Sequence, residues 1–304
     1  MANLAGINLA MQTTFNDRGE IDYTAFENLI DQYIEAGVHG LVLGAGTGQH
    51  PYLTEAECNK LYEVGVKRIN GRVNVICQTS ALNIDEVVRR SRHAESIGAD
   101  ALMVLPPYLE GPSDEDGLFE FYREIDAAVN IDIIGYNIPY ATQISISPQL
   151  LSRLQQLKNF NYIKDSSGDF TVQQQYIQSG GGVLNGGDTL TLYAFLAGTK
   201  GAIWGAANYM PHEAVNLYNL VQEKRLDEAF ALWNRMLPSL LLVQTTNYIP
   251  AVLYAANLRG FGTGNLRKPH RSITEQEATH RSGLTLDELR GRSFVRILKG
   301  RRGP

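Results

Sequence analysis

The amino-acid sequence predicts a closed (β/α)8 TIM barrel with a C-terminal helical extension. Eight short apolar runs alternate with eight longer segments in which apolar residues recur every three or four positions. The runs show no alternation with polar residues, which is typical of parallel strands that crossover helices cover on both faces. No break in composition divides the eight units, and no G-x-G-x-x-G follows the first run. A closed barrel is therefore favoured over an open sheet that binds a nucleotide.

The strands and helices follow one another in a regular order along the chain. The expected strands are Ala5–Met11, Val38–Gly44, Val73–Gln78, Ala101–Pro106, Ile131–Asn137, Tyr162–Asp165, Gly182–Gly187 and Gly201–Trp204. The expected helices are Ile21–Ala36, Glu55–Ile69, Ile84–Ile97, Asp114–Val129, Pro148–Leu157, Phe170–Gln178, Thr189–Leu196 and Pro211–Val221. Thr54, with acidic residues close behind it, is a start signal for the second helix.

The barrel is expected to occupy residues 1–224, and residues 225–304 form the extension. Leu226–Leu242 and Ile249–Leu258 have the pattern of two further helices packed on the outside of the barrel, and Pro238 is expected to kink or end the first. The chain ends in the basic stretch LRGRSFVRILKGRRGP. For this stretch a solvated terminus is favoured over a surface that contacts membranes or nucleic acid.

Composition and charge exclude several classes of protein. With 44% hydrophobic and 19% charged residues, the chain of 304 residues is an ordinary globular protein. Its net charge of −5 gives no general attraction to nucleic acid or anionic lipid, so neither is an expected partner. No stretch approaches the roughly 18 apolar residues of a membrane span. Cys58 and Cys77 do not indicate a disulfide framework, so a cytoplasmic location is the simpler interpretation.

Lys164 is the first candidate for a functional residue. The carboxyl ends of all eight strands meet at one end of a barrel, the mouth, where active sites lie. Lys164 ends the apolar run NYIK, and a lysine is rarely buried without a partner. One interpretation is a local ion pair with Asp165 or Asp169. The other is a Schiff-base nucleophile, because burial lowers the amine pKa from about 10.4 and frees it to attack a carbonyl.

Two further features would complete a site for a 2-oxo acid. Tyr136 ends the preceding strand, so it is expected beside Lys164 at the strand spacing of about 4.8 Å. Its phenol would then transfer the protons of imine formation, unless it is an ordinary rim aromatic. Gly46, Thr47 and Gly48 offer backbone N–H groups and a hydroxyl suited to a carboxylate, unless they form a plain tight turn.

These motifs resemble the dihydrodipicolinate synthase / N-acetylneuraminate lyase family of class I aldolases. The resemblance runs from TTFNDRGEIDY through GAGTGQ, YNIP and YIKDSSGD to GAIWGAANYMP. It implies that Lys164 forms a Schiff base with pyruvate or a pyruvoyl substrate, and that Tyr136 relays protons and orients the substrate. It also implies that Gly46 and Thr47 bind the substrate carboxylate.

The same resemblance implies further site residues and an oligomer. Gly187 and Ile203 would line the pocket around the imine. At the polyol-binding positions of the sialic-acid lyase the chain has Asp188, Thr189 and Gly205, a partial match, and we take Asp188 as a substrate-binding residue. Neither a metal nor a dissociable cofactor is implied. Family members are commonly tetramers built from dimers, so a homo-oligomer, dimer or tetramer, is expected.

Four positions depart from the family pattern. Gly46 stands where a relay hydroxyl is expected, and Gln49 replaces an acid. Leu109 occupies the position of a second tyrosine, and Ala141 stands where the synthase carries an arginine for the distal substrate carboxylate. Synthase activity in lysine biosynthesis is therefore expected to be negligible. The Gly-Thr-Gly turn is more similar to that of keto-deoxy-sugar-acid dehydratases and aldolases.

The sequence thus predicts a lyase that forms a Schiff base with a small 2-oxo acid. The expected substrate is a keto-deoxy sugar acid or a 4-hydroxy-2-oxo acid, which gives pyruvate plus an aldehyde, or a dehydrated oxo acid. One alternative is a barrel that binds a 2-oxo acid without catalysis; another is dihydrodipicolinate synthase proper. A buried amine at Lys164 favours the enzyme over the binding barrel, because a binding protein does not need one.

Overall fold

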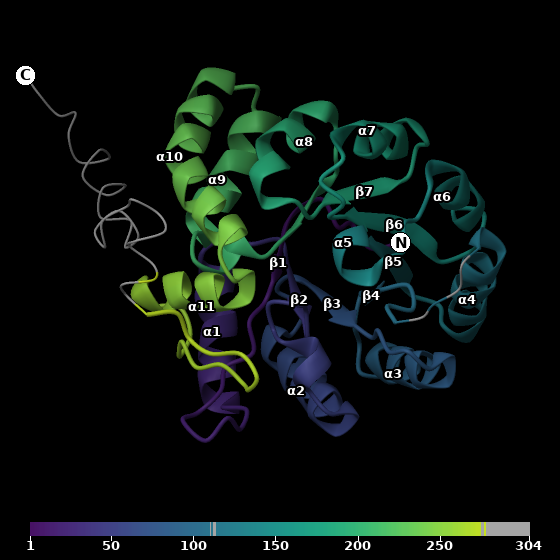
Figure 1. Ribbon diagram of the computed structural model, residues 1–304, viewed down its shortest axis with the longest axis horizontal. Helices are drawn as coiled ribbons and strands as arrows, with labels where there is room; N and C mark the ends of the chain where they lie inside the picture. Colours follow the sequence, from purple (N-terminus) through teal and green to yellow (C-terminus); the bar gives the residue numbers. More distant parts are fainter. Residues whose placement is uncertain (110, 112–113, 275–276, 278–304) are drawn as a thin grey trace, which may run out of the picture.

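The computed structural model describes residues 1–109, 111, 114–274 and 277. Within these residues, parallel strands pair in sequence order and the last pairs with the first, so the sheet is a closed barrel. The strands are β1 (Gly6–Ala10), β2 (Gly40–Leu43), β3 (Asn74–Gln78), β4 (Ala101–Val104), β5 (Asp132–Asn137), β6 (Phe160–Asp165), β7 (Gly182–Asn185) and β8 (Gly201–Trp204). The predicted (β/α)8 barrel is confirmed (Figure 1).

Helices surround the barrel on its outer side (Figure 1). They are α1 (Tyr23–Glu35), α2 (Glu55–Ile69), α3 (Ile84–Ser96), α4 (Glu115–Ala128), α6 (Pro148–Leu154), α7 (Phe170–Gln178), α8 (Thr191–Ala197) and α9 (Pro211–Gln222). Short helical turns also occur in the loops after β2, β5, β7 and β8: η1 (His50–Tyr52), α5 (Pro139–Thr142), η2 (Asp188–Leu190) and η3 (Ala206–Asn208). The segment expected as one helix from Thr189 is therefore divided between η2 and α8.

Two apolar clusters hold the barrel together. One lies between the sheet and the helices, and the other fills the barrel with side chains from all eight strands. The second cluster contains Ala10, Val42, Ile76, Met103, Ile134, Tyr136, Tyr162, Leu184 and Ile203. Because side chains on a strand alternate between its two faces, Lys164 shares the inner face of β6 with Tyr162.

The end of the barrel opposite the mouth, here called the floor, is closed by the N-terminal residues. The Tyr162 hydroxyl donates to the Ala2 carbonyl at 2.6 Å. The Ala2 N–H donates to Asp132, the first residue of β5, and Asn161 donates to the other oxygen of the same carboxylate. The polar groups at the floor therefore bind one another.

Two helices follow the eighth unit: α10 (Leu226–Thr245) packs against α9, and α11 (Tyr248–Leu258) packs against α10 and η3. Pro238 was expected to kink or end the first of these helices; the helix does not end there, since α10 continues to Thr245. Buried residues on both sides of Pro238, including Trp233 and Leu240, keep the helix packed across the missing hydrogen bond. The basic tail lies outside the described residues.

Two findings bear on the expectations from composition. Cys58 and Cys77 are both buried free thiols. In the described part of the chain, no helix has the length and apolar character needed to cross a membrane.

Candidate active site

Lys164 lies in β6 at the mouth of the barrel, directly opposite Tyr136 of β5 in the strand register. Its side chain is only 6% exposed. The Lys164 Nζ atom lies 3.9 Å from the centre of the Tyr136 ring. The structure therefore brings the amine and the phenol side by side, as their positions on neighbouring parallel strands predict.

The neighbouring carboxylates do not neutralise Lys164. Asp165 accepts hydrogen bonds from the side chains of Asn137 and Gln173, and Asp169 caps the start of α7. Among the described residues, Lys164 forms no ion pair with either, so the local ion-pair interpretation is wrong. Burial lowers the pKa of Lys164 to about 7, while the charge of Asp188 acts in the opposite direction. A substantial share of the amine is therefore neutral near pH 7.

Asp188 opens η2, directly after β7, and is 3% exposed. Burial raises its pKa to about 7. The Tyr248 hydroxyl, which donates to Asp188 Oδ2 at 2.8 Å, opposes that rise most strongly. The Lys164 charge, the Trp204 indole and the Ala206 backbone N–H act in the same direction as Tyr248. The site thus holds a second buried group whose protonation changes near neutral pH.

Two glycines permit close packing at the mouth. A Cβ on Gly186 would lie 2.1 Å from Ser166 Oγ and 2.8 Å from Lys164 Cε. A Cβ on Gly205 would lie 2.2 Å from Tyr248 Oη and 3.0 Å from Thr47 Cγ2. The backbone after β7 therefore passes against the lysine, and the backbone after β8 passes against both Tyr248 and Thr47.

The turn after β2 contains Gly46 and Thr47, for which the sequence predicts a carboxylate site. The Thr47 hydroxyl donates to the Ala10 carbonyl, and the Thr13 hydroxyl donates to the Gly48 carbonyl at 2.7 Å. These bonds fix the turn against β1. Gly46 is exposed, and nothing lies within 4 Å of the position that its Cβ would occupy. A relay hydroxyl is thus missing at Gly46 although there is room for one.

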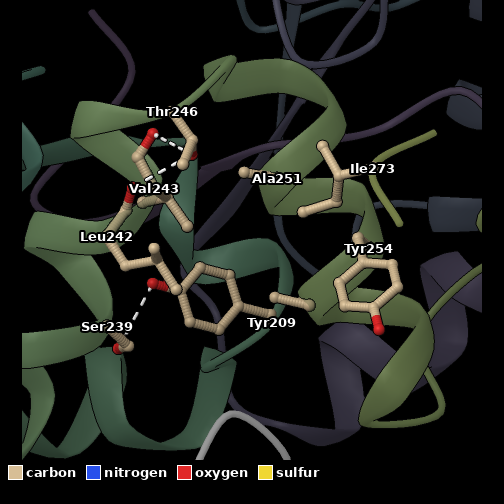
Figure 2. Close-up of a pocket in the computed structure, with 9 residues that line it drawn as sticks. Tyr209, Ser239, Leu242, Val243, Thr246, Ala251, Tyr254 and Ile273 are labelled. Atoms are coloured by element: carbon tan, nitrogen blue, oxygen red, sulfur yellow. Dashed lines mark hydrogen bonds between the residues drawn. The ribbon is translucent and has the colours of Figure 1, made fainter. Parts of the chain in front are cut away.

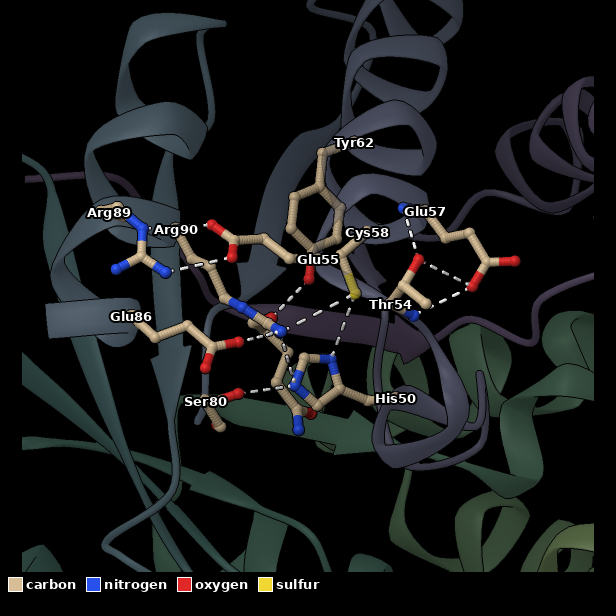
Figure 3. A network of polar contacts seen from close by, with 11 residues as sticks. His50, Thr54, Glu55, Glu57, Cys58, Tyr62, Ser80, Glu86, Arg89 and Arg90 are labelled. Carbon is tan, nitrogen blue, oxygen red and sulfur yellow. Dashed lines mark hydrogen bonds and ion pairs between the residues drawn. The ribbon is translucent and has the colours of Figure 1, made fainter. Parts of the chain in front are cut away.

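A second polar cluster lies behind this turn, beside a cavity of about 190 Å³ (Figure 3). His50 Nε2 bonds to the Ser80 carbonyl at 2.7 Å, and Arg90 pairs with Glu86. Burial lowers the pKa of His50 to about 4, so the ring is neutral at physiological pH. The cluster connects the end of the turn to the loop after β3 and to α3.

The remaining predicted residues occupy different parts of the mouth. Gly187 immediately precedes Asp188, and Ile203 is buried inside the barrel on β8. Leu109, at the position of the family's second tyrosine, is 67% exposed. Ala141 is exposed on α5, and its neighbour Tyr140, 69% exposed, lies at the rim.

Tyr248 is the residue that sequence reasoning missed. It opens α11, which was expected on the outside of the barrel, yet its hydroxyl reaches Asp188. No motif or spacing links the two positions, which are 60 residues apart. The sequence offered one signal, a tyrosine at the start of a strongly apolar helix. A tyrosine on such a helix is expected to be buried, and a buried tyrosine hydroxyl usually forms a hydrogen bond with a polar partner.

No group of three or more His, Cys, Asp or Glu side chains within the described residues is arranged to hold a metal ion. The barrel, the desolvated lysine at its mouth and the adjacent phenol define a class of protein: lyases that act through a lysine Schiff base. Comparison with known proteins identifies the family.

The model of the dihydrodipicolinate synthetase family matches residues 3–285. A 4-hydroxy-tetrahydrodipicolinate synthase from Methanococcus maripaludis strain C6 is 33% identical over 275 residues, which cover 90% of this chain and 94% of the relative. The enzyme of the same name from Bacillus subtilis strain 168 is 30% identical over 292 residues, covering 94% and 100%.

Solved structures agree with the sequence comparison. A crystal structure of dihydrodipicolinate synthase has a TM-score of 0.89 and 28% identity, covering 96% of this chain and 99% of that one. The Escherichia coli K12 prophage protein YagE, solved in complex with pyruvate, has a TM-score of 0.89 and 26% identity, covering 95% and 99%.

The chain belongs to the dihydrodipicolinate synthetase family. It is a lyase of the class I aldolase type, in which pyruvate forms a Schiff base with a lysine of the protein and no further cofactor takes part.

Proposed function

We propose that Lys164 is the Schiff-base lysine and that the substrate is a keto-deoxy sugar acid or a 4-hydroxy-2-oxo acid. The product is pyruvate plus an aldehyde, or a dehydrated oxo acid. The observation that carries the proposal is the burial of Lys164, which lowers the pKa of its amine to about 7 beside the Tyr136 ring. A neutral amine attacks the 2-oxo carbon, and the protonated imine then accepts the electrons of the carbanion.

The other predicted residues have roles that follow from their places at the mouth. Tyr136 moves protons at the imine, since it lies next to the amine. Backbone N–H groups of Gly46 and Thr47 bind the substrate carboxylate, because the Thr47 hydroxyl proton is already given to Ala10. Gly187 and Ile203 line the pocket, and Asp188 faces the distal part of the substrate.

Dihydrodipicolinate synthase proper is the second candidate, because the relatives cited above carry that name. Ala141 argues against it, since alanine cannot pair with a second carboxylate. A charge-assisted contact of this kind is worth roughly 1.5–3 kcal/mol. Purified protein should therefore condense pyruvate with aspartate semialdehyde far more slowly than it converts its best sugar acid. Comparable rates would favour the synthase.

Trapping the imine tests the lysine. Protein treated with pyruvate and borohydride should show one adduct per chain by mass spectrometry, on the peptide that contains NYIKDSSGD. Lys164→Arg should lose both adduct and turnover, because guanidinium does not deprotonate in proteins. An adduct on another lysine contradicts the assignment. Tight binding of a 2-oxo acid without any adduct favours the non-catalytic barrel.

A substrate panel tests the remaining part of the proposal. Keto-deoxy sugar acids and 4-hydroxy-2-oxo acids of increasing length should be assayed separately for release of pyruvate and for dehydration. We expect turnover with at least one compound that carries hydroxyls beyond C4, because the buried Asp188 offers a polar partner there. A preference for unsubstituted short acids would argue against a sugar-acid substrate.

The chain is further proposed to form a homo-oligomer. Five large apolar side chains are partly exposed on α8 and α10: Tyr193, Leu196, Leu226, Phe230 and Leu241. The two helices are in contact, and exposed apolar side chains on adjacent helices favour association. Light scattering of the purified protein should give a mass of two or four chains.

A further inference from the structure

Asn208, the last residue of η3, carries a buried amide that the reaction described above does not use. The residue follows β8 and is fully buried. Its Nδ2 group donates to two backbone carbonyls, that of Ala10 at the end of β1 and that of Gly205 after β8, each at 2.7 Å. One side chain therefore ties together the ends of two strands that are neighbours in the barrel.

The orientation of this amide is fixed by the groups that face its oxygen. Asn208 Oδ1 accepts hydrogen bonds from the Gln12 backbone N–H at 3.0 Å and from the Tyr33 hydroxyl at 3.1 Å. Donors face the amide oxygen and acceptors face the amide nitrogen, so the reverse orientation would set one carbonyl against another. Both polar atoms of the side chain are thus held in place by hydrogen bonds.

Both residues to which the Asn208 amide donates also contact Thr47, in the turn after β2. The Thr47 hydroxyl donates to the same Ala10 oxygen. A Cβ on Gly205 would lie 3.0 Å from Thr47 Cγ2, so the methyl group lies against the Gly205 backbone. The two branches of the Thr47 side chain therefore rest on the two backbone segments that Asn208 holds.

Thr47 provides one of the two backbone N–H groups that are proposed to bind the substrate carboxylate, and Gly46 provides the other. Within the described part of the chain, neither N–H group donates to a protein acceptor. Thr47 is 5% exposed, so it is largely shielded from water. An open donor in such a place suits an anion, and its direction depends on how the residue is held.

The backbone of η3 is anchored separately, by the residue that follows Asn208. Tyr209 is buried, and its hydroxyl donates to Ser239 of α10 at 3.4 Å (Figure 2). The same tyrosine lines a small apolar cavity between α10 and α11. Because this anchor does not involve the Asn208 side chain, the loop should stay in place when that side chain is shortened.

We propose that Asn208 positions Thr47 for the substrate carboxylate and thereby sets the affinity of the site for 2-oxo acids. The inference rests on the proposed function, because it requires that the carboxylate bind at the turn after β2. Asn208 acts through two backbone carbonyls, so it is a positioning residue. Lys164 and Tyr136 belong to β6 and β5, which pair with neither β1 nor β8, so the amine chemistry should not depend on Asn208.

The first experiment measures the rate of adduct formation on Lys164 at a series of pyruvate concentrations, with borohydride as the trap and mass spectrometry as the readout. Asn208→Ala should raise the half-saturating pyruvate concentration by about 10–100-fold, the range for one lost hydrogen bond to a charged group. The plateau rate should change little, since a loss of uniform binding raises the half-saturating concentration alone. An unchanged half-saturating concentration overturns the proposal.

Methyl pyruvate separates this effect from general damage to the site. The ester has the same 2-oxo carbon as pyruvate but no negative charge, so it gains little from the N–H group of Thr47. In Asn208→Ala the ratio of the rate with pyruvate to the rate with methyl pyruvate, both at low concentration, should fall by about 10–100-fold. Equal losses with both compounds would indicate a merely structural role and would overturn the proposal.

Thr47→Val tests the same contact from its other side and remains informative if Asn208→Ala fails to fold. Valine keeps the shape and the backbone N–H but cannot donate to the Ala10 carbonyl. This variant should also need more pyruvate, with little change for methyl pyruvate. The double variant should show less than the product of the two single effects, because both act on the Ala10 carbonyl. A wild-type response of Thr47→Val, or a full product in the double variant, overturns the link between the two residues.

Asn159→Ala is the matched control. Asn159 is also buried, and its amide also donates to two backbone carbonyls, those of Asp126 at 3.1 Å and Val129 at 2.9 Å. It directly precedes β6, at the floor of the barrel. This variant should lose stability but keep the wild-type ratio between the two compounds. A wild-type protein that forms no adduct contradicts the proposed function itself, whereas a normal wild-type adduct with unchanged Asn208 and Thr47 variants contradicts only this inference.

Discussion

Polar side chains at the two ends of the barrel differ in how their hydrogen bonds and charges are compensated. At the floor, Asp132, Asn161, Tyr162 and the Ala2 backbone bind one another. At the mouth, Lys164 and Asp188 are just as buried, yet their pKa values are both shifted to about 7. Mutually satisfied polar groups stabilise a fold, whereas groups held out of water with incomplete compensation are ready to exchange protons.

The largest expected contrast comes from the same substitution at each end. Tyr136→Phe should lower turnover by about 10²–10⁴-fold, because it removes a proton carrier beside Lys164, while the pyruvate adduct still forms slowly. Tyr162→Phe should leave turnover unchanged and lower the free energy of unfolding by about 0.5–1.5 kcal/mol through loss of the bond to Ala2. Steady-state kinetics and denaturant titration measure the two effects. Similar losses of turnover in both variants would contradict the comparison.

Glycines at the two ends of β7 provide a second contrast. Gly186→Ala should lower turnover by about 10²-fold, because the new Cβ displaces Lys164 Cε, from which it would lie 2.8 Å. The two nearest atoms belong to side chains and the Asp165 carbonyl oxygen would lie 3.2 Å away, so the loss of stability should be smaller than in Gly182→Ala. In Gly182→Ala the Cβ would lie 2.3 Å from the Tyr162 ring and 2.9 Å from the Asn161 carbonyl. This variant should lose about 1–3 kcal/mol of stability with unchanged turnover. An active Gly186→Ala enzyme would show that the Lys164 position is not critical.

His50, behind the mouth, should make stability depend on pH. Its pKa is about 4 in the folded protein, below the ordinary 6.5. Between these values the unfolded chain takes up a proton that the folded protein excludes, so the free energy of unfolding falls as pH falls from 6.5 to 4. The contribution is up to a few kcal/mol, at about 1.4 kcal/mol per pKa unit.

Denaturant titration at several pH values checks this expectation. His50→Gln, which does not titrate, should show a shallower decline than the wild type between pH 6.5 and 4. His212→Gln, which changes an exposed histidine on α9, should keep the wild-type decline. Identical slopes in the His50 variant and the wild type would exclude His50 as the cause.

The smallest effect is expected in the turn after β2. Gly46→Ala should change the free energy of unfolding by less than about 0.5 kcal/mol, because no atom lies within 4 Å of the new Cβ. Gly48→Ala is the matched contrast, since its Cβ would lie 2.8 Å from the Met11 carbonyl. That variant should be measurably less stable by denaturant titration. Equal stabilities would mean that the turn adjusts freely around Gly48.

The sequence predicted the barrel well because its local patterns have a direct physical cause. Unalternated apolar runs such as Val38–Gly44 match strands that are buried on both faces. The predicted pairing of Tyr136 with Lys164 is confirmed, since consecutive strands of a parallel barrel are neighbours and both residues come at strand ends. The short elements α5 and η2 could not be predicted in this way, because single helical turns have no periodicity to detect.

What the sequence determined by itself was the barrel, its mouth and the lysine within it, since strand and helix periodicity are local properties of the chain. Tertiary structure alone decided the surroundings of that lysine. The burial that shifts the pKa of Lys164 and Asp188 depends on all eight strands closing around them. The meeting of Tyr248 with Asp188 depends on how α11 docks against η3. The way α11 docks is set by packing between residues that are far apart in the sequence. No local sequence pattern predicts such packing.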